Sequence, residues 1–107
     1  MNAEHTPPAK AAAHFRSGYN CAQSVLLALS EAWSFKSDAV PKVASGFGGG
    51  IGRCGSVCGA LTGAVMALGL RYAIDEPSPE KRQPVYDHAR ALYRQFEKQF
   101  GTVLCRD

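Results

Sequence analysis

The stretch that decides the fold is GFGGGIGRCGSVCGALTGAVMALGL, residues 46–70. It opens with five glycines in the seven residues 46–52, and its only charged side chain is that of Arg53. From Val57 onward, apolar side chains cover nearly every side of a helical projection, which is typical of a helix buried inside a protein. The sequence therefore predicts a central, Gly-rich core helix over residues 57–72 that is entered from a glycine loop.

Four other segments have helical patterns and recognisable ends. Residues 9–17 are rich in alanine, and residues 21–33 follow Asn20, a good N-cap, with apolar positions three and four apart. A short helix begins near Ser37 or Asp38 and ends at Gly46, and a long helix over 79–100 ends at Gly101. No segment alternates like a strand. We predict an all-α fold, a compact bundle of about five helices.

The whole chain is predicted to form one domain over residues 1–107, because this length supports one hydrophobic core. Its N-terminus, residues 1–8, is expected to be loose, and residues 101–107 form a C-terminal tail that carries Cys105. The inner face of the long helix is predicted to consist of apolar residues at helical spacing: Val85, Ala89, Leu92, Tyr93, Phe96 and Phe100.

Composition excludes several classes of partner. The 12 basic and 9 acidic residues leave a net charge of +3 without a basic cluster, so we expect no nucleic-acid partner. The uncharged stretch 54–70 is short for a membrane span and rich in glycine, so we expect no membrane partner. Residues 1–15 lack the pattern of a signal peptide, which predicts a cytoplasmic protein. A domain this small buries a limited share of its surface, so a homodimer is an alternative to a monomer.

The cysteines are the candidate functional residues. In a cytoplasmic chain, cysteines are more often catalytic, redox-active or metal-binding than paired in structural disulfides. Cys21 follows the predicted N-cap Asn20, and Cys58 lies in the first turn of the central helix if Ser56 is its N-cap. The positive end of a helix dipole favours a thiolate. Cys54 lies in the loop one turn earlier, and Cys105 lies in the tail.

The glycine loop is the candidate cofactor-binding segment, through Gly48, Gly49, Gly50 and Gly52. It does not follow a strand and lacks the Gly-Lys-Ser/Thr ending of a phosphate-binding P-loop. We interpret it instead as a loop whose N–H groups point at sulfur atoms, or one that lets chain segments pack closely.

Four motifs in order resemble one known family. They are YNCAQ at 19–23, ASGFGGGIG at 44–52, GSVCGALTG at 55–63 and FGTVLCR at 100–106. This pattern is similar to the C_GCAxxG_C_C family of small prokaryotic proteins, whose name records suspected redox activity. The resemblance implies that Cys21, Cys58 and Cys105 are the family cysteines. No Cys-x-x-Cys-His motif is present, so covalent haem is not implied.

Three functions remain open from the sequence. The first is a redox-active protein that uses Cys21, Cys58 and Cys105 in thiol–disulfide exchange or electron transfer, with a partner protein or small thiol. The second is a metal-thiolate protein in which Cys21, Cys54, Cys58 and Cys105 hold an iron–sulfur cluster or zinc. The third is a structural helical dimer whose cysteines only pack.

Overall fold

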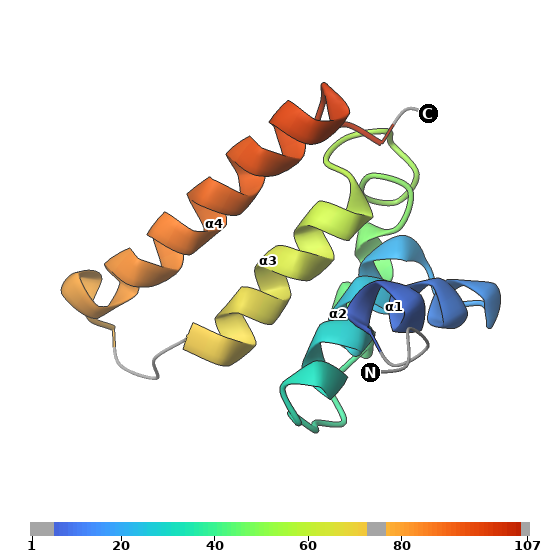
Figure 1. Cartoon of the computed structure of the whole chain (residues 1–107), viewed down its shortest axis with the longest axis horizontal. Helices are drawn as coiled ribbons and strands as arrows, with labels where there is room; N and C mark the ends of the chain where they lie inside the picture. Colours follow the sequence, from blue (N-terminus) through green and yellow to red (C-terminus); the bar gives the residue numbers. More distant parts are fainter. Residues whose placement is uncertain (1–5, 73–76, 106–107) are drawn as a thin grey trace.

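The computed structural model describes residues 6–72 and 77–105 of the chain. Within this part the fold is all-α, as predicted. The helices are α1 (Pro7–Arg16), α2 (Cys21–Ala32), the 3-10 helix η2 (Lys42–Phe47), α3 (Gly59–Tyr72) and α4 (Pro79–Phe100). Figure 1 shows α4 along the side of α3 that faces away from α1 and α2.

Helix α2 begins where the sequence predicts, because Asn20 caps it. The Asn20 side chain accepts a hydrogen bond from the Gln23 N–H at 2.9 Å, and the Gln23 side chain accepts one from the Asn20 N–H at 3.1 Å. This reciprocal pair satisfies two N–H groups that a helix start leaves unpaired. Helix α1 begins at Pro7, two residues before the predicted Ala9, because Thr6 supplies its cap.

The core lies between α2, η2 and α3. Its fully buried residues are Ala22 and Leu26 of α2, Ala44 of η2 and Ala67 of α3. Because three of these four residues are alanine, the helix backbones approach closely. Helix α3 contacts α2, η2 and α4, which agrees with its predicted central place, although Val65 on α3 is 37% exposed.

Two further helix starts differ from the prediction. The short helix does not begin near Ser37 or Asp38 but at Lys42, as a 3-10 helix. Pro41 has no N–H to donate and keeps the preceding residue out of helical geometry, so the helix begins only after it. Helix α3 begins at Gly59 rather than Val57, because residues 56–58 pair with the C-terminal tail.

Helix α4 has the predicted bounds and ends at Gly101, whose φ of 78° is left-handed. Among the described elements it packs against α3 alone, so a single face is covered. Val85, Ala89, Leu92 and Phe96 are half-buried on that face. The predicted inward positions of Tyr93 and Phe100 are wrong, since these side chains are 42% and 60% exposed.

Among the described helices, none combines the length and the apolar composition that a membrane crossing requires.

Candidate functional site

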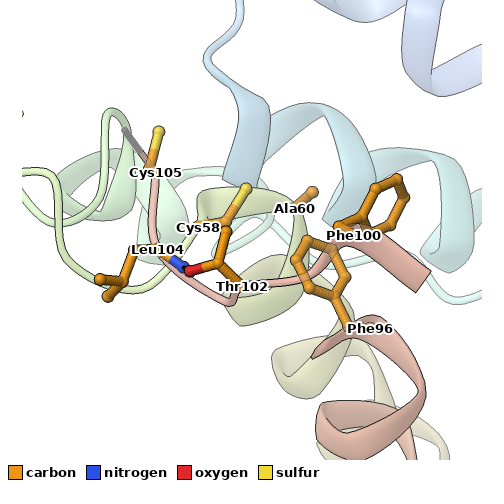
Figure 2. Close-up of a pocket in the computed structure, with 7 residues that line it drawn as sticks. All are labelled: Cys58, Ala60, Phe96, Phe100, Thr102, Leu104 and Cys105. Carbon is orange, nitrogen blue, oxygen red and sulfur yellow. Dashed lines mark hydrogen bonds between the residues drawn. The ribbon is translucent and has the colours of Figure 1, made fainter. Parts of the chain in front are cut away.

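The site is built where the tail folds back on the segment before α3. Cys58 donates its backbone N–H to the Val103 carbonyl at 2.7 Å, and Cys105 donates its N–H to the Ser56 carbonyl at 2.7 Å. These bonds flank an antiparallel bridge between Val57 and Leu104. Since side chains alternate along extended chains, Cys58 and Cys105 lie on the same face of this short ribbon as diagonal neighbours. Figure 2 shows both sulfur atoms pointing to one side.

Cys21 joins this pair from the start of α2. A Cβ added to Gly59 would collide with the Cys21 sulfur, so this sulfur lies directly against the first residue of α3. The Cys105 thiol interacts electrostatically with both Cys58 and Cys21. The structure therefore brings together the three cysteines that the sequence singled out, from the helix α2, the segment before α3 and the tail.

Cys58 is placed at the end of α3 where negative charge is most favoured. Its carbonyl accepts the N–H groups of Leu61 at 3.0 Å and Thr62 at 3.1 Å, which makes Cys58 the residue that precedes the first helical turn. Cys58 therefore lies next to the N–H groups of that turn, at the positive end of the helix dipole. The sequence analysis placed Cys58 within the first turn of the helix, whereas in the structure it precedes that turn.

The surroundings of Cys105 favour the protonated form of its thiol. Its partial burial raises the pKa of the thiol above the ordinary value of 9.0, and negative charge on Cys58 and then on Cys21 raises it further. The neighbouring Cys58 side chain thus contributes to the raised pKa of Cys105 as a nearby polar and charged group. Cys105 is thus held as a neutral thiol beside Cys58.

Cys58 and Cys105 line one end of an open, mainly apolar pocket of about 400 Å³. The other lining residues come from α3, α4 and the tail (Figure 2): Ala60, Phe96, Phe100, Thr102 and Leu104. The Phe96 and Phe100 rings have centroids 4.7 Å apart and are tilted by 51°. The sequence analysis placed both phenylalanines on the inner face of the long helix. It missed that they lie one helical turn apart at the end of α4 that is nearest to Cys105.

In the glycine loop, several N–H groups bond to carbonyl oxygens of the loop itself. Residues 49–53 all have positive φ values, between 57° and 74°, so the chain makes a left-handed turn here. The N–H groups of residues 51–56 donate to carbonyl oxygens of residues 46–51, which leaves them engaged within the loop. Gly48, Gly49 and Gly52 line a separate pocket of about 350 Å³ together with Asn20 and Arg53. The cofactor-binding role assigned to Gly48, Gly49, Gly50 and Gly52 stays a prediction.

Cys54 is set apart from the other three cysteines. Its side chain is exposed on the glycine loop, and its N–H donates to the Ile51 carbonyl at 3.0 Å. Within residues 6–72 and 77–105, no group of three or more His, Cys, Asp or Glu side chains has the spacing to hold a metal ion. The set Cys21, Cys54, Cys58 and Cys105 is therefore not arranged as a four-thiolate metal site.

Comparison with known proteins agrees with this cysteine pattern. Residues 19–107 match the family described as "Putative redox-active protein (C_GCAxxG_C_C)". A relative from Archaeoglobus fulgidus, named "Uncharacterized protein", is 36% identical over 97 residues, covering 82% of this chain. The chain spans 64% of that relative's length. No solved structure matches the chain. The matched region holds Cys21, Cys54, Cys58 and Cys105, and covers more than four fifths of the sequence, so the chain belongs to the C_GCAxxG_C_C family.

Proposed function

We propose that this protein carries out thiol–disulfide exchange, with Cys58 as the attacking thiolate and Cys105 as the resolving thiol. One observation carries the proposal: the pairing of Val57 with Leu104 places Cys58 and Cys105 on one face, at one end of a pocket. A dithiol protein needs an accessible thiolate and a second thiol within bonding reach. Cys58 precedes the first turn of α3 and fits the first role.

The raised pKa of Cys105 fits the second role. A neutral thiol does not compete for the incoming disulfide, because the thiolate is the nucleophile. After Cys58 has formed a mixed disulfide, it no longer carries a negative charge. The part of the rise in the Cys105 pKa that this charge causes is then lost. Cys105 can then lose its proton to solvent and attack the Cys58 sulfur, releasing the substrate's second sulfur as a thiolate.

The third cysteine, Cys21, lies against Gly59 and close to this pair. Because its sulfur also interacts with Cys105, it offers a second route to a protein disulfide if either partner is blocked. The redox partner in this proposal is another protein or a small thiol. Thiols that cycle between oxidised and reduced forms suit the reducing cytoplasm of a prokaryotic cell.

The test is to map the disulfide that mild oxidation forms. A Cys54→Ser variant removes the exposed thiol and is oxidised with diamide, a two-electron thiol oxidant. Free thiols are then counted and peptides are identified by mass spectrometry. We expect one pair of thiols to be lost and a Cys58–Cys105 linked peptide to appear. Adding Cys58→Ser should abolish the linkage, whereas adding Cys21→Ser should preserve it. If all three thiols stay titratable after oxidation, the proposal is wrong.

Metal-thiolate binding and structural dimerisation remain the alternatives. Metal binding requires movement of the exposed loop that carries Cys54, or ligands from outside the described residues. Purification without oxygen, followed by measurement of iron, sulfide and zinc, distinguishes it: stoichiometric metal that disappears in Cys58→Ser would favour the metal function. A purely structural role would instead leave folding and association unchanged when all four cysteines are replaced.

A further inference from the structure

The pocket in Figure 2 has a chemical character that goes beyond holding two thiols. Phe96 and Phe100 on α4 face the sulfur end across Ala60, and Phe100 remains 60% exposed. An aromatic ring left in water at the rim of a pocket gains free energy when an apolar group covers it. The surface beside the thiols therefore favours an apolar occupant.

Among the described residues, the lining of this pocket offers no ion-pair partner for a charged occupant. Apart from the two thiols, its lining contains four apolar side chains and the hydroxyl of Thr102, which accepts the Leu104 N–H at 3.1 Å. The basic residues Arg94 and Lys98 line a different pocket of α4. A carboxylate or ammonium group brought against the phenylalanine rings would lose water without gaining an ion pair, which is costly.

The size of the pocket limits the occupant to a small molecule or one arm of a larger one. Its volume of about 400 Å³ lies at the lower end of the range for small-molecule sites, roughly 300 to 1,000 Å³. One flat ring beside a disulfide bond would fit this volume, and the ring could lie against the tilted pair of phenylalanines.

We propose that the substrate of Cys58 and Cys105 is an uncharged disulfide with flat, apolar substituents, which the pocket binds between the thiols and the Phe96–Phe100 pair. This inference rests on the proposed thiol–disulfide function. The Cys58 thiolate attacks one substrate sulfur, the substrate S–S bond breaks, and one thiolate leaves. The Cys105 thiolate then attacks the Cys58 sulfur and releases the second. The substrate disulfide is reduced to two thiols, and the protein dithiol is oxidised to a disulfide.

The experiment compares two aromatic disulfides that differ in charge. Uncharged dithiobis-nitropyridine and doubly anionic dithiobis-nitrobenzoate both release coloured thiolates. Each reacts with reduced Cys54→Ser protein under pseudo-first-order conditions, and each rate constant is divided by that of free cysteine with the same reagent. High salt suppresses attraction between the anionic reagent and the net charge of +3.

We expect the normalised rate constant of the uncharged reagent to exceed that of the anionic reagent by roughly tenfold, the effect of one good aromatic contact. Phe100→Ala should remove most of this excess. Tyr86→Ala is the matched control, because Tyr86 is an exposed aromatic residue of the same helix, 53% exposed, that does not line the pocket.

Three results would overturn the inference. Equal normalised rate constants for the two reagents would remove the preference for uncharged substrates while leaving the thiol–disulfide function intact. If the uncharged reagent still reacts faster than the anionic one in Phe100→Ala, the preference for uncharged substrates does not come from this pocket. A dimer in sedimentation that dissociates in Phe100→Ala would assign the pocket to a second copy of the chain. Failure of the thiol–disulfide function itself is seen separately, as unchanged thiol counts after oxidation.

Discussion

The Cys21 sulfur lies against Gly59, in the space that a Cβ at residue 59 would fill. The absence of a side chain at one position thus sets how closely the N-terminal ends of α2 and α3 approach. It also brings Cys21 to the thiol pair, so packing and candidate chemistry depend on the same glycine.

Gly59→Ala is expected to destabilise the protein by about 1 to 3 kcal/mol through overpacking. The added Cβ would meet the Cys21 sulfur, the Ala22 N at 3.0 Å and the Phe47 O at 3.2 Å. Cys21→Ala removes the first obstacle, so the double variant should recover part of the loss, with a coupling of about 0.5 to 2 kcal/mol. Urea unfolding of the four proteins in the cycle measures it. Strict additivity would show that the sulfur is not the obstacle.

Gly63→Ala tests the close contact between α2 and α3 at a position where the neighbouring atoms do not include sulfur. Its Cβ would stand 2.5 Å from the Ala22 carbonyl oxygen, which is backbone and cannot move aside cheaply. We expect a loss of about 1 to 3 kcal/mol in the free energy of unfolding. Gly69→Ala on the same helix has open space around its Cβ and should gain up to about 1 kcal/mol from helix propensity. Equal effects at the two positions would contradict the close contact.

Asn20 serves two elements, and two substitutions separate its roles. Its side-chain oxygen caps α2, and its side-chain nitrogen donates to the Ser45 carbonyl in η2 at 3.0 Å. Asn20→Ala should cost about 1 to 2 kcal/mol by removing both interactions. Asn20→Asp keeps the cap and should lose only the contribution of the second bond, about 0.5 to 1.5 kcal/mol. If aspartate is as damaging as alanine in thermal unfolding, the cap is not the main contribution.

The raised pKa of Cys105 predicts how stability depends on pH. The folded state holds this proton more tightly than the unfolded chain, whose thiol titrates near 9.0. Below that pH both states are protonated and the stabilising effect is fully present; as pH rises from 9.0 through the higher folded-state pKa, it is lost. The free energy of unfolding of wild type minus that of Cys105→Ser should therefore fall with rising pH in this window. A difference that is flat or rises with pH would contradict the assignment.

Local sequence patterns predicted the helices because their causes are local. Asn20 with Gln23 fixes the start of α2, and Gly101 fixes the end of α4. The exposure of Tyr93 and Phe100 was missed because the apolar pattern of α4 does not reveal that it packs against α3 alone.

The site was predicted only as a set of residues. Helix starts and the family resemblance both pointed to Cys21 and Cys58, and the resemblance added Cys105. That Cys58 and Cys105 interact depends on the pairing of Val57 with Leu104, which are remote in sequence and carry no strand pattern. The same pairing moved the start of α3, so one non-local contact accounts for both the error in the helix boundary and the geometry of the site.

The pairing of the tail with residues 56–58 also sets an order of events during synthesis. A ribosome makes Cys21 and Cys58 before Cys105, and at about 5 to 20 residues per second the delay after Cys58 is about 2 to 10 s. During that interval Cys105 does not yet exist, and the α4 wall of the pocket is still being made. The nascent chain can therefore expose the two earlier cysteines, but it acquires the complete dithiol only when almost all of the described fold has been translated.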